Sequence, residues 1–224
     1  MEQQLPACFV RVARGDGVYM TLTTDVVVVG GGVVGMTAAL AMHLRGFVVS
    51  LVDASTCKVN LDNIDRRVYA LNRTSIDLFV ALGVWQVLEQ SRVSPYEKMH
   101  IWDAISGKCL DFDARLVGEA CLGVIVEEAI LKQALLQRLG DLGVQCLFDS
   151  PVREVEVRGD KCLVQAGAME IITSLLIVAD GANSIVRELL RVPIVTKPYY
   201  QDAIVATVQT EKVHQRTAYQ VFHP

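Results

Sequence analysis

A run of valines leads directly into a glycine-rich turn near the start of the chain, and this junction constrains the fold more than any other feature. Residues 26–29 are four consecutive valines, and Gly30, Gly32 and Gly35 follow with the spacing G-x-G-x-x-G. Such a β-branched run suits a strand buried on both faces of a parallel sheet. The sequence therefore predicts a strand, a tight turn and a helix over about residues 33–45.

Each glycine has a distinct role in a turn of this kind. The first permits the turn, the second lets a pyrophosphate approach the backbone, and the third lets the helix pack closely on the strand. The N-terminus of the helix then points its free N–H groups and its positive dipole end at the phosphates. The candidate phosphate-binding residues are Gly30, Gly31, Gly32, Val34 and Gly35.

An acidic residue follows at the distance that a dinucleotide-binding βαβ unit requires. A second strand, expected over residues 47–52, leads to Asp53, with 17 residues between Gly35 and Asp53. A carboxylate at that strand end can accept both hydroxyls of an adenosine ribose. The alternative, a glycine-rich hairpin loop, leaves Asp53 and the long helix unexplained. The motif indicates an ADP-binding unit and leaves FAD and NAD both open.

A second turn of interest lies in the stretch "LLIVADGANSIVR" at residues 175–187. An apolar strand ends there in Asp180-Gly181, and a helix begins near Asn183 or Ser184. Ligands of α/β sheets bind at the carboxyl edge of the strands, where this turn is expected. The alternative is a simple helix cap made by Asn183 or Ser184.

Several motifs together resemble one enzyme family. The stretches are "GGGVVG" at 30–35, "RRVYALN" at 66–72, "LGVW" at 82–85, "VE" at 126–127, "ADGANSIVR" at 179–187 and "AIVATVQTEKVHQRTAYQVF" at 203–222. This combination resembles the FAD-dependent aromatic hydroxylases, the para-hydroxybenzoate-hydroxylase-like flavoprotein monooxygenases. Within them it is most similar to the ubiquinone-biosynthesis hydroxylases, over roughly residues 21–224.

The resemblance implies FAD as cofactor, NAD(P)H as reductant and contacts to the cofactor from Arg67, Val126, Asp180 and Gly181. A guanidinium also suits a pyrophosphate chemically, although a solvated surface arginine is the alternative for Arg67. In this family a C4a-hydroperoxide of the reduced flavin transfers oxygen to an electron-rich ring, so no catalytic side chain is expected. His214 is expected to be a solvated histidine in a surface turn.

The implied substrate is a polyprenylated phenol or quinol. The implied setting is cytoplasmic, with peripheral membrane contact and a ubiquinone-biosynthesis complex as partners. Three alternatives remain: a flavin hydroxylase of another aromatic compound, an inert fragment or assembly partner, and an NAD dehydrogenase, which Asp180-Gly181 disfavours. Family members continue for about as much chain again, so we expect a truncated chain whose catalytic competence is in doubt.

The expected fold is α/β, with a Rossmann-like parallel-sheet domain interleaved with an incomplete antiparallel sheet of the substrate domain. Residues 1–20 are expected to be an unstructured or artefactual tail. Residues 21–95 and 113–195 are assigned to the FAD-binding domain. Residues 96–112 and 196–224 are assigned to a truncated substrate-binding domain.

Composition excludes several other classes. The formal net charge is −4 with both signs scattered along the chain, so no basic tract is present to bind nucleic acid. No apolar stretch reaches the roughly 18 residues of a membrane helix. The six cysteines are widely spaced and lack a C-x-x-C pair, which predicts reduced thiols and no metal site. They are Cys8, Cys57, Cys109, Cys121, Cys146 and Cys162.

Overall fold

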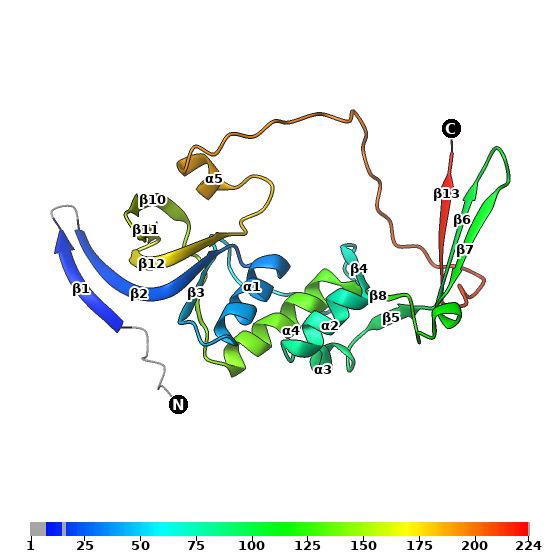
Figure 1. The fold of residues 1–224 in the computed structure, drawn as a ribbon, viewed down its shortest axis with the longest axis horizontal. Coiled ribbons are helices and arrows are strands. Elements are labelled where there is room, and N and C mark those ends of the chain that lie inside the picture. Colours follow the sequence, from blue (N-terminus) through cyan, green and yellow to red (C-terminus); the bar gives the residue numbers. More distant parts are fainter. Residues whose placement is uncertain (1–7, 15–16, 224) are drawn as a thin grey trace. The chain divides into compact units, whose positions relative to one another are not determined.

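The computed structural model describes residues 8–14 and 17–223, with side chains from Met20 onward, and it separates into two compact units (Figure 1). Unit 1 comprises residues 1–59 and 135–199, and unit 2 comprises residues 60–134 and 200–224. The boundaries therefore differ from the expected domains, because residues 60–95 and 113–134 group with unit 2. Three strands from these two segments pair with one another, which explains the grouping.

A mixed sheet forms the centre of unit 1. Its order among the described strands is β10-β11-β12-β2-β3-β9, and β1 pairs with β2. The strands β12, β2, β3 and β9 run parallel, whereas β10, β11 and β12 form an antiparallel meander. The strands span β1 Cys8–Arg14, β2 Gly17–Val29, β3 Val49–Val52, β9 Gln145–Leu147, β10 Val152–Arg158, β11 Lys161–Ala166 and β12 Met169–Val178.

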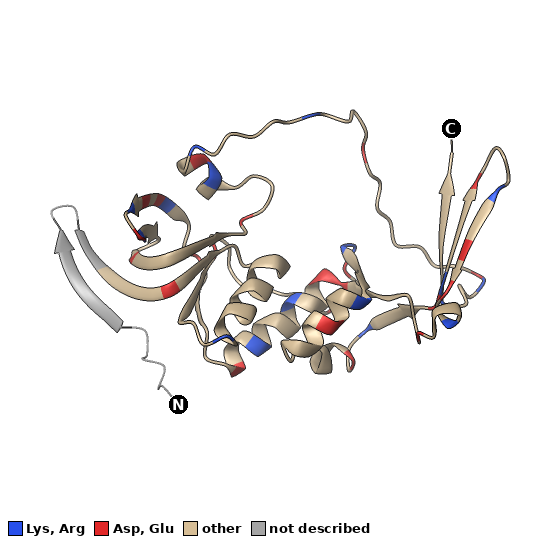
Figure 2. Ribbon diagram, in the orientation of Figure 1, with Lys and Arg blue, Asp and Glu red and all other residues tan. Residues whose placement is uncertain are grey.

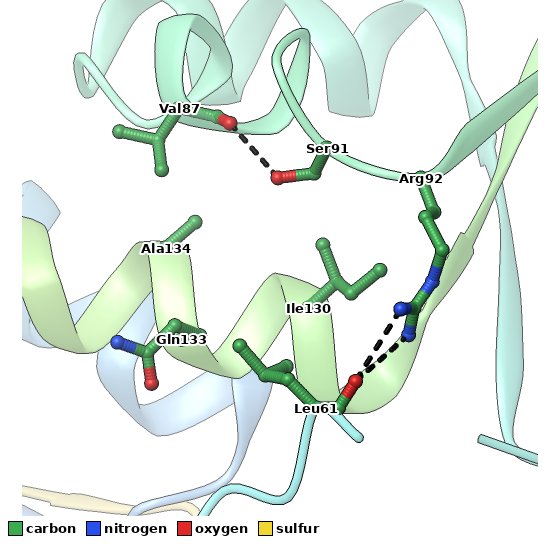
Figure 3. A pocket seen from close by; sticks show the side chains of 7 residues that line it. All are labelled: Leu61, Val87, Ser91, Arg92, Ile130, Gln133 and Ala134. Atoms are coloured by element: carbon green, nitrogen blue, oxygen red, sulfur yellow. Dashed lines mark hydrogen bonds between the residues drawn. The ribbon is translucent and has the colours of Figure 1, made fainter. Parts of the chain in front are cut away.

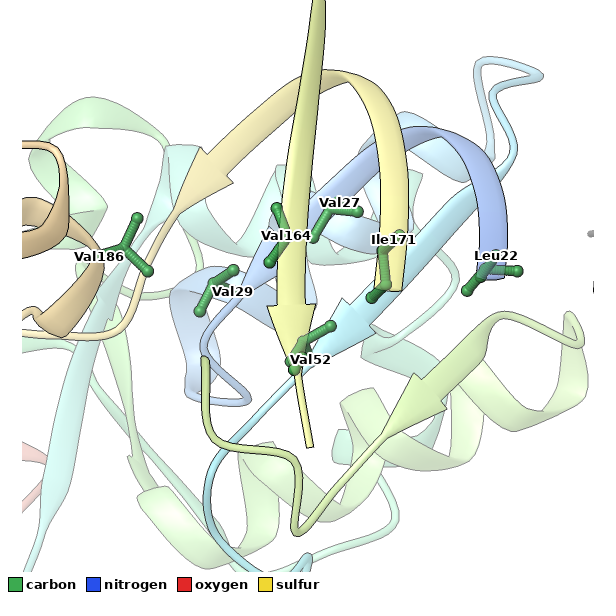
Figure 4. Packing of buried hydrophobic residues seen from close by; sticks show 8 residues of the cluster. Leu22, Val27, Val29, Val52, Val164, Ile171 and Val186 are labelled. Atoms are coloured by element: carbon green, nitrogen blue, oxygen red, sulfur yellow. The ribbon is translucent and has the colours of Figure 1, made fainter. Parts of the chain in front are cut away.

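The valine run is buried on both faces of this sheet, as its composition predicts. Val27 and Val29 belong to a cluster that includes Val52 from β3 (Figure 4). Successive side chains of a strand alternate between faces, so Val26 and Val28, which are also buried, point to the other face. The cluster comprises Leu22, Val27, Val29, Val52, Val164, Ala166, Ile171 and Val186.

The predicted helix after the glycines is present as α1, Val33–His43. It contacts β2 and β3 and buries Gly35, Met36, Ala39 and Leu40. This spacing of small and apolar residues gives the helix a buried stripe against the sheet. The close α1–β2–β3 packing fixes where the first turn of the helix lies relative to the ends of the strands.

The N-terminal segment differs from the unstructured tail expected for residues 1–20. Strand β1 pairs antiparallel with the start of β2, from Cys8 opposite Thr23 to Arg14 opposite Gly17. Phe9, Val10 and Val12 are residue types that favour a strand, although the strand was not predicted. Residues 1–7 and 15–16 lie outside the described residues.

Unit 2 holds two small sheets. One has the order β4-β8-β5 and is antiparallel; the other has the order β13-β6-β7, in which β13 runs parallel to β6. The strands span β4 Val68–Asn72, β5 Val93–Tyr96, β6 Lys98–Asp103, β7 Cys109–Asp113, β8 Gly123–Glu127 and β13 Thr217–Phe222.

Two short helices lie between β4 and β5. They are α2, Arg73–Ala81, and α3, Trp85–Leu88. Gly83 separates them with a φ of 72°, a conformation that ends a helix and favours glycine. The helix α4, Glu128–Asp141, follows β8 directly, and a 3₁₀ turn covers Ala114–Val117.

The chain joins the second sheet of unit 2 through β13. Residues 196–224 were assigned to the substrate-binding domain, but residues 192–216 contain no helix or strand. This segment is rich in β-branched residues, but its side chains are exposed. Strand propensity without a partner to pack against does not form a sheet.

Helix α5, Ile185–Leu189, offers a modest test of local structure. The buried Ser184 side chain accepts a hydrogen bond from the Arg187 N–H at 3.0 Å and caps the helix. Ser184→Ala should lower the free energy of unfolding by about 1 kcal/mol, the usual worth of such a cap. Asn183→Ala is the matched control, because Asn183 is exposed and makes no cap. Urea unfolding of both variants checks this; equal losses would contradict it.

Candidate cofactor-binding site

The parallel strands of unit 1 end together at one edge of the sheet. The Gly30 N–H donates to the Val52 carbonyl at 2.8 Å, and the Ala179 N–H donates to the Val29 carbonyl at 2.7 Å. The residues that follow β2, β3 and β12 therefore lie side by side. Gly30, Asp53 and Asp180, predicted separately from three stretches of sequence, come together at this carboxyl edge, where ligands of such sheets bind.

Backbone geometry shows why glycines occupy the turn. Gly30 has a φ of +116°, and a Cβ there would stand 2.2 Å from the Ala179 carbonyl oxygen. A Cβ on Gly35 would stand 1.9 Å from the Gly30 carbonyl oxygen. Neither approach tolerates a side chain. The predicted roles of Gly30 in the turn and of Gly35 in close packing agree with this geometry.

Gly32 differs from these two glycines. A Cβ at Gly32 would meet no protein atom within 4 Å, and its φ of −77° suits any residue. Neither strain nor protein packing therefore explains the glycine. Open space above the backbone, at the start of a helix, is what the approach of a phosphate group requires.

The N-terminus of α1 also has no side-chain cap. Gly32 is the N-cap residue and supplies no side chain, and the first helical bond runs from the Met36 N–H to the Gly32 carbonyl at 3.0 Å. The N–H groups of the first turn therefore face outward, and the first turn contains no acidic residue. Val34 lies in this turn with its side chain 73% exposed. An anion is the natural partner for such a helix end.

Asp53 is half-buried and held in a fixed orientation beside the turn. Its Oδ2 accepts the N–H of Gly31, and its Oδ1 accepts the N–H of Ser55 at 2.7 Å as well as the Ser55 hydroxyl. A carboxylate has about four acceptor positions, so the two oxygens retain capacity for hydroxyl donors. Ser55 is a functional neighbour that the sequence analysis missed; the Asp-x-Ser spacing of an Asx-turn would have indicated it.

Asp180 has a buried oxygen that lacks a donor. Its Oδ2 accepts the Val186 N–H at 3.2 Å, whereas its Oδ1 is buried without a hydrogen-bond partner among the described residues. Gly181 follows with a φ of +90°. Ser184 is the helix cap, so the capping role expected for Asn183 or Ser184 falls to Ser184. The Oδ1 of Asp180 is therefore an acceptor that a hydrogen-bond donor of a bound ligand would satisfy.

Arg67 and Val126 belong to unit 2. The Arg67 side chain is 80% exposed and lies 3.7 Å from the Glu128 carboxylate, which also binds Lys132 at 2.9 Å. Val126 is buried in β8, opposite Tyr69 of β4 and Val93 of β5. The cofactor contacts of Arg67 and Val126 remain predictions.

The carboxylates beside these two residues are stabilised in their charged form. Hydrogen bonds from Arg92 lower the pKa of Glu127 against the opposing effect of burial. Burial would raise the pKa of Glu128, but hydrogen bonds from Lys132 and Tyr69 outweigh it, so that this pKa is lowered. Glu127, Glu128 and Arg92 were not singled out as site residues from the sequence.

Charged residues of both signs lie along α4 and β10 (Figure 2). Among the residues that the structure describes, no group of three or more His, Cys, Asp or Glu side chains could hold a metal ion. Five cysteines are free thiols; Cys8 precedes the described side chains. Burial, with a smaller contribution from Cys57, raises the pKa of Cys146 to about 11, which makes it a weak nucleophile.

The sequence of the chain is similar to known proteins over most of its length. A family model described as "FAD binding domain" matches residues 23–222. The chain is similar to the 3-demethoxyubiquinol 3-hydroxylase of Escherichia coli (strain K12), with 30% identity over 215 residues, 90% of this chain and 52% of that protein. It is 33% identical over 204 residues to the ubiquinone hydroxylase UbiL of Rhodospirillum rubrum, covering 89% of this chain and 47% of that protein.

Among solved structures, the p-nitrophenol 4-monooxygenase PnpA of Pseudomonas putida DLL-E4 superposes with a TM-score of 0.62. The identity is 19%, and the match covers 75% of this chain and 44% of that one. This likeness shows the fold, a Rossmann-like mixed α/β arrangement. The chain spans about half the length of the relatives it matches.

Proposed function

The chain belongs to the FAD binding domain family, and from this premise we propose that it binds FAD at the carboxyl edge of β2, β3 and β12. The observation that carries the proposal is the joint placement of the Gly30–Gly35 turn and Asp53 at that edge. The open space at Gly32, the uncapped start of α1 and the unpartnered Oδ1 of Asp180 support it, because each fits a group that the cofactor would supply.

Each predicted residue has a role in this proposal. The backbone of Gly30, Gly31, Gly32, Val34 and Gly35 holds the pyrophosphate. Asp53 accepts the ribose hydroxyls, and Ser55 and the Gly31 N–H keep its carboxylate in place. Asp180 and Gly181 lie beside the pyrophosphate and ribityl part, where the buried Oδ1 accepts a hydroxyl donor. Arg67 and Val126 complete the contacts.

We propose that the whole protein is an FAD-dependent monooxygenase that hydroxylates a polyprenylated phenol or quinol in ubiquinone biosynthesis. The names of two relatives, a demethoxyubiquinol hydroxylase and a ubiquinone hydroxylase, support the substrate class. FAD, when bound and reduced by NAD(P)H, supplies the reaction with O2. The chain's own residues bind and orient the cofactor, and no side chain is assigned a proton-transfer role.

We also propose that the protein works in the cytoplasm at the periphery of a membrane, within a ubiquinone-biosynthesis complex. The low water solubility of a polyprenyl chain supports this placement, because such a substrate resides in lipid. Among the described residues, no helix is long and apolar enough to span a bilayer. Flotation with lipid vesicles would test the membrane contact.

Purification of the whole protein, followed by flavin absorbance and oxygen uptake, tests the function. We expect stoichiometric flavin, and NAD(P)H-dependent oxygen uptake that a polyprenylated phenol stimulates more than a small unprenylated one. Equal stimulation by both would favour a hydroxylase of another aromatic compound. Bound flavin without stimulated uptake would indicate a cofactor-binding chain that does not turn over.

A further inference from the structure

Arg92 of unit 2 is hydrogen-bonded to the main chain of the segment that precedes Arg67. The Arg92 guanidinium donates from Nη1 and Nη2 to the Leu61 carbonyl at 3.3 Å, and from Nη2 to the Asn63 carbonyl at 3.5 Å. Arg92 and Leu61 lie at one end of a pocket of about 190 Å³ between α3 and α4 (Figure 3). The segment 61–63 has no helix or strand of its own, and the bonds from Arg92 tie its main chain to the residue before β5.

The same guanidinium forms a bidentate ion pair with the Glu127 carboxylate. Nε donates to Oε1 at 3.0 Å, and Nη2 donates to Oε2 at 3.1 Å. The Glu127 side chain is 10% exposed and the Arg92 side chain 52% exposed. This geometry, in which both carboxylate oxygens are engaged, specifies orientation as well as attraction.

Glu127 in turn accepts a hydrogen bond from the main chain of Asp65. Its Oε2 accepts the Asp65 N–H at 2.8 Å. The Asp65 carboxylate in turn accepts the Arg67 N–H at 3.0 Å and the Ala129 N–H at 3.1 Å. The Arg67 carbonyl accepts the Glu128 N–H at 2.9 Å. Both main-chain polar groups of Arg67 are therefore fixed, while its side chain remains exposed.

We propose that Arg92 is a positioning residue for FAD binding and that it acts by fixing the main chain of Arg67. The path runs through Glu127 and Asp65. The inference rests on the proposed function, in which Arg67 contacts the cofactor. The Arg92 guanidinium donates to the Glu127 carboxylate and to the Leu61 and Asn63 carbonyls, and it is assigned no contact with FAD.

A mutant cycle on FAD affinity tests this role. Arg92→Gln removes the ion pair with Glu127 and the hydrogen bonds to the Leu61 carbonyl. FAD should therefore bind about tenfold more weakly, as expected when one hydrogen bond to a charged group is lost. Arg67→Gln should weaken binding at least as much. Because Arg92 acts only through Arg67, the double variant should bind FAD no more weakly than Arg67→Gln alone. Flavin-fluorescence titration gives the dissociation constants.

A matched control separates positioning from general loss of an ion pair. Arg115 pairs with Asp113 at 2.5 Å in the same unit but makes no bond to the 61–67 segment, so Arg115→Gln should leave FAD affinity unchanged. If Arg92→Gln fails to fold, Arg92→Lys replaces it. A single ammonium group cannot span Leu61 and both oxygens of Glu127, so the same non-additive loss is expected.

The outcomes distinguish a failure of the Arg92 proposal from a failure of the proposed FAD binding. A wild-type chain that binds no FAD overturns the proposed function and this inference with it. Wild-type binding that Arg67→Gln weakens and Arg92→Gln does not overturns the inference alone. Additive losses in the double variant also overturn it, because Arg92 would then act independently of Arg67.

Discussion

Gly30→Ala is expected to lower the free energy of unfolding by roughly 2–6 kcal/mol, close to the whole stability of a small domain. The φ of +116° is strained for alanine, at roughly 1–3 kcal/mol. The new Cβ would also stand 2.2 Å from the Ala179 carbonyl oxygen, and overpacking of this kind costs roughly 1–3 kcal/mol more. Chemical denaturation monitored by far-UV circular dichroism measures the loss.

Gly32→Ala is the control for this prediction, two residues away in the same turn. Its Cβ meets no protein atom within 4 Å, so the melting temperature should stay within a few degrees of wild type. The same Cβ would occupy the space proposed for the pyrophosphate, so FAD binding should weaken. A Gly30→Ala variant as stable as Gly32→Ala would contradict the described turn. A Gly32→Ala variant with unchanged FAD affinity would contradict the placement of the pyrophosphate.

Asp53→Ala is expected to weaken FAD binding by roughly 1.5–3 kcal/mol, or about ten- to 150-fold, the usual worth of hydrogen bonds to a charged group. The variant removes the acceptor proposed for the ribose hydroxyls and releases the Gly31 N–H and Ser55 that Asp53 holds. Fluorescence titration with FAD measures the change.

The matched control is Asp25→Ala. Asp25 carries the same charge as Asp53 and lies on β2, the strand that precedes the glycine-rich turn. Its Oδ2 accepts the Val48 N–H at 2.8 Å. It lies at the opposite end of the paired parts of β2 and β3 from the turn. FAD affinity should therefore stay within about twofold of wild type. Equal losses in the two variants would show that removal of any acidic side chain suffices and would remove Asp53 from the proposed site.

The glycine-rich turn could be predicted from the sequence because its determinants are local. The valine run, the three glycines and Asp53 form one βαβ unit, and the structure places each of them where that unit requires. Asp180 could be read for a similar reason, since an Asp-Gly pair after an apolar strand marks the end of a sheet strand. The parallel pairing of β12 with β2 then brings Asp180 beside Gly30.

Contacts between segments that are distant in the sequence could not be predicted in the same way. Arg92 contacts Glu127 because β5 pairs antiparallel with β8, and a contact between residues 35 apart in the sequence leaves no local signal. Strand β1 was missed because its residues precede the expected first strand and show no clear period. Residues 196–224 were assigned to the substrate-binding domain, but the exposed residues before β13 form no strand, since β-branched composition alone does not supply a partner.

Hydrogen–deuterium exchange of the chain with and without saturating FAD tests the central claim most directly. FAD held at the proposed edge should slow exchange at the amides of residues 32–35, whose N–H groups would face the pyrophosphate, and at residues 181–182 after Asp180. Unchanged exchange at both segments, with FAD bound and protection appearing elsewhere, would contradict the assignment of this edge as the cofactor site.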